Sequence, residues 1–409
     1  MRILHTSDWH IGRTLCGRKR YDEYESFLTW MAEIIQRNEI EVLLIAGDVF
    51  DTTAPSNKAQ ELYYQFLYKV STSTCKHVVI VAGNHDSPSF LNAPRELLKI
   101  LNVHVVGNVS GDLDDEVLVL YDRQNVPKMI VCAVPYLRDK DIRIAEAGES
   151  ATDKERKLLE GISKHYSDVG ELADQKRLEL RRDIPVVGMG HLFTSGGQVV
   201  DDDGVRELYI GSLARVSADA FPKSFIYTAL GHLHSSQKVV KSETIRYSGS
   251  PLPMGFGEAK QKKSVLIVDI DHDTATVKQI EVPVFQPIES IQGDWEDISN
   301  RITDLSVEDT NVWLEIVYTG DEIISDLQDR LSMSIEDTPL EILRVKNNRV
   351  IERALEQVSL EESLDSLSEI DVFTRCLDDH DVPEDQRPDM MMAYKEILLS
   401  IQESDSQAE

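Results

Sequence analysis

The stretch VVIVAGNHD, residues 78–86, joins an apolar run directly to a polar cluster. The run is β-branched and too short for a helix, so it predicts a buried strand. Gly83 then allows a sharp turn and a close approach of the backbone before Asn84, His85 and Asp86. We therefore expect these three polar side chains at the carboxyl end of a strand.

Other apolar runs of the chain end in the same way. VLLIAG (42–47), VVGMG (186–190) and YTALG (227–231) each stop at a short polar cluster. Between the early runs, SFLTWMAEIIQR and QELYYQFLYKV have the apolar spacing of helices. This is the pattern of an α/β protein, in which ligands bind at the carboxyl ends of the strands.

The length of 409 residues and the hydrophobic content of 41% predict a globular chain of two or three domains. We expect a first domain at residues 1–284, closed by a β-hairpin after residue 255. A small β-α-β unit is predicted within residues 285–348, from a strand in NVWLEIVYTG, a helix in DEIISDLQDRLSM and a strand in TPLEILRVK. An acidic segment with two short amphipathic helices is expected at residues 349–409.

The net charge of −29 is concentrated at the C-terminal end. Residues 285–409 hold 32 Asp and Glu against 9 Lys and Arg, a balance of −23, which leaves −6 for residues 1–284. This acidity would repel nucleic acid, so any binding of nucleic acid must come from local basic patches or from a partner protein. GRTLCGRKR is such a patch and is either a phosphate-binding loop or an ordinary solvated loop; its cations are Arg13, Arg18, Lys19 and Arg20.

Cysteine usage and the N-terminal sequence favour a cytoplasmic protein. The four cysteines, Cys16, Cys75, Cys132 and Cys376, have no CxxC spacing, which argues against a disulfide framework or a structural zinc site. Charged and polar residues such as Arg2 interrupt the first segment, so we expect no secretory signal, and no apolar run is long enough for a membrane span.

The polar clusters supply carboxylate, amide and imidazole ligands: Asp8, His10, Asp48, Asn84, His191, His232 and His234. This mixture suits manganese, iron or zinc. Seven ligands are too many for one ion but enough for two ions that share a carboxylate. His232 and His234 share one face of a strand. Taken by themselves, these two histidines could equally be ordinary polar residues that bond to water.

Five short motifs occur in the order D-x-H, G-D, G-N-H-D, G-H and G-H-x-H. In this the chain resembles the metallophosphoesterase superfamily, which implies a β-sandwich flanked by helices. The resemblance implies one metal ion on Asp8, His10, Asp48 and His234, and a second on Asp48, Asn84, His191 and His232. It also implies that His85 protonates the leaving alkoxide and that Asp86 orients the His85 ring.

Longer stretches, among them MRILHTSDWHIG, AGDVFDTTAPS and YSGSPLPMGFGEAKQKKSVLIVDI, resemble the bacterial branch of the double-strand-break repair nucleases. That resemblance implies a manganese-dependent nuclease component in DNA repair, replication and recombination. Proteins of this kind degrade duplex DNA from the 3′ end and open hairpins or blocked ends together with an ABC/SMC-type ATPase. It further implies a homodimer formed through helices in QELYYQFLYKV and APRELLKILN.

The resemblance also gives expected roles to the two C-terminal segments. Residues 285–348 would form a capping domain that presents DNA, and residues 349–409 would bind the ATPase. A small-molecule or cyclic-nucleotide phosphodiesterase is the alternative enzyme. A non-catalytic scaffold is disfavoured, because no ligand position is lost.

Overall fold

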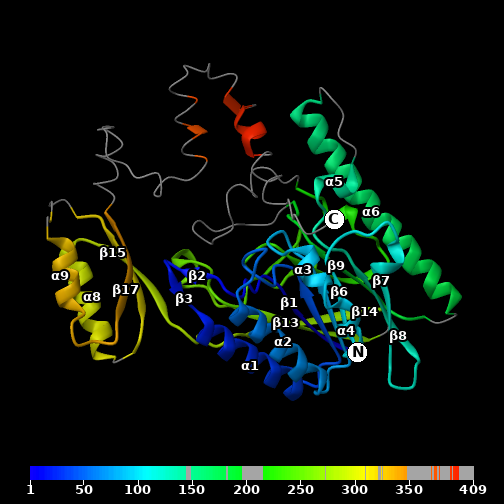
Figure 1. Cartoon of the computed structure of the whole chain (residues 1–409), viewed down its shortest axis with the longest axis horizontal. Helices are drawn as coiled ribbons and strands as arrows, with labels where there is room; N and C mark the ends of the chain where they lie inside the picture. Colours follow the sequence, from blue (N-terminus) through cyan, green and yellow to red (C-terminus); the bar gives the residue numbers. More distant parts are fainter. Residues whose placement is uncertain are drawn as a thin grey trace.

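The computed structural model describes residues 1–143, 149–180, 183–195, 215–271, 273–308, 310–320, 324 and 326–347. Beyond these it describes residues 370, 373–374, 377, 387–388 and 390–395. Two sheets packed face to face form the main body of the chain (Figure 1).

The first sheet has the strand order β14-β13-β1-β4-β5-β6. Its strands are β1 Arg2–Thr6, β4 Val42–Ala46, β5 His77–Val81, β6 Val103–Val106, β13 Ser264–Asp271 and β14 Thr274–Glu281. The four strands from β1 to β6 in this order are parallel, whereas β13 pairs antiparallel to β1. The predicted closing hairpin is therefore β13 and β14.

The second sheet has the order β11-β12-β10-β9-β8-β7. Its strands are β7 Val117–Tyr121, β8 Pro127–Ala133, β9 Val186–His191, β10 Phe225–Gly231, β11 Gln237–Lys238 and β12 Ile245–Tyr247. The central strands β8, β9, β10 and β12 are parallel.

The core between the sheets explains the continuous apolar runs of the sequence. Leu44 and Val79 of the first sheet share one buried cluster with Met189 and Ala229 of the second. A strand covered on both faces has no solvent side, so its residues are apolar without alternation. The predicted sandwich flanked by helices is confirmed.

Helices cover the outer faces of both sheets. The helices α1 Tyr21–Arg37, α2 Asn57–Ser71, α3 Pro88–Asn92 and α4 Arg95–Ile100 pack against the first sheet, and Phe27 and Phe66 pack with Leu43 in one cluster. After the short α5 Asp139–Ile142, the long α6 Ala151–Glu179 buries Tyr166 against β8 and β9 of the second sheet.

A separate small sheet follows the sandwich. It consists of β15 Ile288–Gly293, α8 Trp295–Val307, β16 Trp313–Tyr318, α9 Leu327–Ser334 and β17 Glu341–Asn347, with three parallel strands in the order β15-β16-β17. The predicted strand-helix-strand unit corresponds to β16, α9 and β17. The sequence pattern did not reveal β15 and α8, which precede it.

The small sheet contacts the hairpin formed by β2 Thr14–Leu15 and β3 Arg18–Lys19 (Figure 1). Leu15, Phe256 and Trp313 form a buried apolar cluster across this contact. Arg18 lies 5.9 Å from the Trp313 ring centroid and forms an ion pair of 3.0 Å with Glu341. The hairpin thus holds the small sheet against the sandwich.

Most of the predicted C-terminal helical pair lies outside the described residues. Of those described, Phe373 and Tyr394 stack with ring centroids 3.9 Å apart, and Leu377 is buried. Within the described part of the chain, no helix has the length and apolar character needed to cross a bilayer.

Candidate metal centre

The site forms where the loops after β1, β4, β5, β9 and β10 meet. Four of its residues have left-handed backbone, with φ of 54° at Asp8, 47° at His10, 50° at Asp48 and 107° at His232. Non-glycine residues avoid this region because Cβ clashes with the backbone, at a cost of about 1–3 kcal/mol each. Strain of this kind persists where surrounding contacts impose it, and it concentrates at functional sites.

Hydrogen bonds between the loops impose this geometry. The backbone N–H of Asp8 donates to Gly47 O at 3.0 Å, and that of His10 donates to Asp48 O at 3.0 Å. From the second sheet, His232 N–H donates to Asp8 Oδ1 at 2.9 Å. The edges of both sheets are therefore joined directly through the predicted ligands.

Glycines of the motifs make room for the ligands. A Cβ on Gly47, which has φ of +87°, would lie 2.2 Å from Nδ1 of His191. A Cβ on Gly83 would lie 2.1 Å from Oδ1 of Asp48. Real Cβ atoms do not approach other atoms so closely, so both positions require glycine.

Asp8, His10 and His234 form the first ligand group. One ligand atom of each lies within 4.8 Å of the others, and all three side chains are buried. His10 Nε2 and His234 Nε2 are 3.2 Å apart. At this distance one nitrogen donates its proton to the other in a hydrogen bond, and a cation bound by both rings would take the place of that proton.

Asn84, His191 and His232 form the second group. Asn84 Oδ1 lies 3.0 Å from His191 Nε2 and 3.1 Å from His232 Nδ1. His191 Nδ1 bonds Ala46 O at 2.9 Å. A carbonyl only accepts, so Nδ1 carries a proton in either state of the ring, and Nε2 would offer its lone pair to a cation once it has lost its own proton.

Asp48 lies between the two groups. Its Oδ2 is 3.5 Å from His10 Nε2 and 3.3 Å from His191 Nε2, and its side chain is 2% exposed. Oδ1 accepts the backbone N–H of His85 at 2.9 Å. All seven predicted ligands are thus brought together, with His234 beside His10, His232 beside Asn84, and Asp48 in the position of a bridge.

The pKa values show how the cluster balances charge. Burial raises the pKa of Asp8 to about 6, and burial lowers that of His232 to about 3. At His191 burial opposes the charged ring, but the Asp48 carboxylate outweighs it and raises the pKa to about 9. A His191–Asp48 ion pair therefore supplies the positive charge that the buried carboxylates require.

This donor set fits two divalent cations. Two buried carboxylates, an amide oxygen and four imidazoles converge where the protein's own protons now balance the charge. Cations would replace those protons, because each ligand binds in its deprotonated form.

His85 and Asp86 differ in what the structure assigns to them. His85 Nδ1 donates to the carbonyl of Asp51 at 3.0 Å. Asp86 instead accepts backbone N–H groups of Val49, Phe50 and Gly83, at 3.1, 3.0 and 2.9 Å. The ring-orienting role predicted for Asp86 is corrected, because its carboxylate joins the loops after β4 and β5.

Asp51 is a site residue that sequence reasoning missed. Its Oδ1 lies 3.5 Å from His10 Nδ1 and 3.1 Å from an Arg13 nitrogen, while its carbonyl holds His85. Burial opposes its charge, but contacts with His10 and Arg13 hold the pKa of Asp51 well below its usual range. The sequence feature that could have identified Asp51 is its position three residues after Asp48 in the same loop.

The four cations of the predicted basic patch do not act alike. Arg20 is 3% exposed and pairs with Glu23 at 2.7 Å. Arg13 bonds Asp51 and the Met254 carbonyl. Arg18 contacts the small sheet, as described above, and Lys19 is exposed. The four residues were predicted to form one patch because they are close in sequence, and closeness in sequence carries no information on which side chains are buried.

Comparison with known families agrees with the fold and the site. Residues 1–234 match the calcineurin-like phosphoesterase family. Residues 284–381 match the Type 5 capsule protein repressor C-terminal domain. The family match, the sandwich and the candidate ligands at its strand ends together define a metallophosphoesterase.

Similar proteins identify a particular family within the metallophosphoesterases. The D subunit of the nuclease SbcCD from Escherichia coli (strain K12) is 35% identical over 405 residues, 98% of each chain. The proteins of that name from Rhodobacter capsulatus and Bacillus subtilis are 37% and 34% identical, over 66% of each chain. This chain belongs to the family formed by the D subunits of SbcCD nucleases. A solved dimetal phosphatase from Danio rerio matches with a TM-score of 0.42 and 13% identity, over 69% of this chain and 98% of that one.

Proposed function

We propose that the chain is the DNA nuclease subunit of an SbcCD-like complex and cleaves phosphodiesters with two Mn²⁺ ions. The observation that carries this proposal is the position of Asp48, whose Oδ2 lies 3.5 Å and 3.3 Å from histidines of the two ligand groups. A carboxylate shared between adjacent ions is typical of sites that cleave phosphoesters. Mixed nitrogen and oxygen ligands without thiolate suit Mn²⁺.

The protein's own groups would orient the substrate and move a proton. When bound, the two ions would activate a water and neutralise charge on the phosphoryl group. His85, with Nδ1–H held by the Asp51 carbonyl, is proposed to protonate the leaving oxygen through Nε2. Burial lowers the pKa of His85 to about 4 in the metal-free protein. A phosphate anion beside the ring would raise that pKa, because it favours the charged form.

We propose that DNA lies across the site between the sandwich and the small sheet, with the small sheet presenting the duplex. Lys19 is exposed on β3 and Arg18 is half-exposed beside the small sheet. These two residues are the proposed phosphate contacts of the basic loop. Arg13 and Arg20 are proposed to support the loop, since both bond protein carbonyls.

The activities proposed for the complex are a 3′-to-5′ double-strand exonuclease and an endonuclease at hairpins and blocked ends, acting in the cytoplasm in repair, replication and recombination. The partner is an SbcC-like ABC/SMC ATPase, which residues 349–409 would bind. A homodimer is proposed through α2 and α4. These helices expose large apolar side chains, Tyr68 at 66%, Leu97 at 67% and Ile100 at 77%, where an isolated chain would favour polar ones.

The test is incubation of pure protein, with Mn²⁺ or Mg²⁺, on labelled hairpin and linear DNA beside a chromogenic phosphodiester. The proposal is supported if the wild-type protein cleaves both DNAs and the Asp48→Asn variant cleaves neither. Cleavage of the small phosphodiester alone favours a small-molecule or cyclic-nucleotide phosphodiesterase. A chain ended near residue 349 should keep Mn²⁺-dependent cleavage and lose co-purification with the ATPase. Full ATPase binding by that variant would remove the role of the C-terminal segment.

A further inference from the structure

A buried ion pair stands behind one of the predicted metal ligands. Lys263 Nζ lies 2.7 Å from Glu258 Oε2, and the two side chains are 6% and 0% exposed. Glu258 ends the short helix η3 Phe256–Glu258, and Lys263 directly precedes β13. Removing two charges from water carries a large desolvation cost that their attraction offsets only in part, so such a pair is weak as a source of stability. Its neighbours indicate another role.

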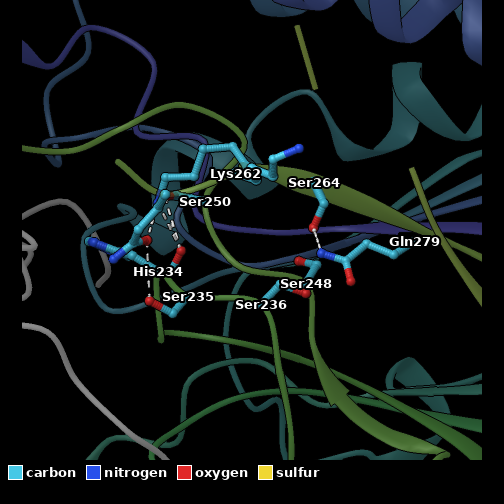
Figure 2. Close-up of a pocket in the computed structure, with 10 residues that line it drawn as sticks. His234, Ser235, Ser236, Ser248, Ser250, Lys262, Ser264 and Gln279 are labelled. Carbon is cyan, nitrogen blue, oxygen red and sulfur yellow. Dashed lines mark hydrogen bonds between the residues drawn. The ribbon is translucent and has the colours of Figure 1, made fainter. Parts of the chain in front are cut away.

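On one side the pair fixes the backbone of His234. Lys263 Nζ donates to the His234 carbonyl at 3.1 Å and to Ser250 Oγ at 3.0 Å. The same carbonyl accepts Ser250 N–H at 3.0 Å, and it shares the Ser250 O–H, at 3.3 Å, with Leu252 O at 3.0 Å. His234 and Ser250 both line a pocket of about 260 Å³, and Figure 2 shows them next to each other there. Three donor groups therefore hold the main-chain carbonyl of His234.

On the other side Glu258 faces the His234 ring. Its Oε1 lies 3.9 Å from His234 Nδ1, and the opposite ring nitrogen, Nε2, is the atom 3.2 Å from His10 Nε2. A carboxylate beside Nδ1 favours the proton on that nitrogen and leaves the Nε2 lone pair for a cation. Because 3.9 Å exceeds a hydrogen bond, the carboxylate acts on the ring through its charge in a dry environment.

The loop that carries Glu258 is itself held in place. Met254 N–H donates to Glu258 Oε2 at 2.7 Å, so Oε2 serves Met254 and Lys263 while Oε1 is directed at His234. Arg20 donates to Pro253 O at 2.6 Å, and Arg13 donates to Met254 O at 3.2 Å. These two arginines of the basic loop thus support the segment that places Glu258.

We propose that Glu258 is a positioning residue for the metal ligand His234, with Lys263 as its counter-ion. Glu258 sets the tautomer and basicity of the ring, and Lys263 offsets the carboxylate's charge while holding the His234 carbonyl. This inference rests on the two-metal site proposed above and is independent of whether DNA is the substrate.

The test measures Mn²⁺ binding to the full chain by calorimetry and thermal unfolding in EDTA. Glu258→Gln keeps an acceptor for Met254 N–H and removes the charge. One of the two Mn²⁺ sites should lose about 10- to 100-fold in affinity, the range typical for partners of metal-bound histidines. Unchanged affinity at both sites, or an equal loss at both, would overturn the proposal.

Two further variants separate positioning from folding. The double variant Glu258→Gln with Lys263→Met removes both buried charges, so it should regain thermal stability without regaining Mn²⁺ affinity. Recovery of both would make Glu258 a structural partner only. The matched control is Glu116→Gln, which weakens a pair of 2.7 Å between the buried Glu116 and the partly buried His165. It should lower the unfolding temperature and leave Mn²⁺ affinity unchanged, and a loss of affinity there would also overturn the proposal. A wild-type protein that binds two Mn²⁺ ions but cuts no DNA would remove the proposed function alone.

Discussion

Replacing Gly83 with alanine should disable the metal centre through a single methyl group. The added Cβ would lie 2.1 Å from Asp48 Oδ1 and 2.4 Å from Asp48 N. Ordinary contact distances are about 3.5 Å, so Asp48 must retreat by roughly 1 Å or more. Asp48 cannot retreat freely, because its Oδ1 accepts His85 N–H at 2.9 Å and its own backbone already has φ of 50°.

The expected loss follows from this displacement. A misplacement of about 1 Å in a catalytic group costs on the order of 10²-fold in rate. Gly83→Ala should therefore cleave a chromogenic phosphodiester about 10²-fold more slowly with Mn²⁺ and bind Mn²⁺ more weakly by calorimetry. Overpacking should also lower the free energy of unfolding in EDTA by about 1–3 kcal/mol.

Gly111→Ala is the matched control, because a Cβ there meets no atom within 4 Å. It should retain wild-type rate, Mn²⁺ affinity and stability. If Gly83→Ala also cuts the chromogenic substrate and binds two ions as the wild type does, the placement of Asp48 against the loop after β5 is wrong.

Four further outcomes are expected. Asp48→Asn should lose both ions, and metal counting after dialysis that still finds two tightly bound ions would contradict its bridging role. His85→Gln should slow DNA cleavage by about 10²- to 10⁴-fold but cost less on an activated nitrophenyl ester; equal losses would argue against proton donation. Lys19→Gln should reduce the slope of log affinity for DNA against log salt concentration by about 0.9, and an unchanged slope would exclude Lys19 as a phosphate contact. Arg20→Gln breaks a buried ion pair with Glu23, so it should instead destabilise the fold. Because Asp48 raises the pKa of His191 to about 9 against the effect of burial, the ring's contribution to metal-free stability is full below about pH 6.5 and lost as pH rises through about 9. Mn²⁺ binding should displace that proton and tighten over the same interval, and calorimetry that finds no pH dependence there would refute this charge balance.

The sequence alone predicted the α/β pattern and the candidate ligands, and the resemblance of its five motifs to the metallophosphoesterases predicted the sandwich. Each polar cluster that holds the candidate ligands follows a buried strand closely, often after a glycine, and these features are local. A strand that is covered on both faces must be apolar throughout, and its polar residues can lie only at its end. The parallel strands then bring their ends to the same edges, where the structure finds Asp8, Asp48, Asn84, His191 and His232. Similarly, the pattern of β16, α9 and β17 was readable because each element has its own period.

Only the tertiary structure decided the contacts among residues distant in the chain. Asp86 follows His85 directly, yet its carboxylate points away to the backbone of Val49 and Phe50, because the sharp turn sends neighbouring side chains in different directions. Arg20 belongs to a basic run but is buried, since its surroundings come from Glu23 and the segment near Pro253. Glu258 shares no local pattern with His234, and packing of η3 beneath the site brings its carboxylate within 3.9 Å of the ring. Burial and orientation depend on what the rest of the chain places around a residue, and hydrophobic periodicity does not carry that information.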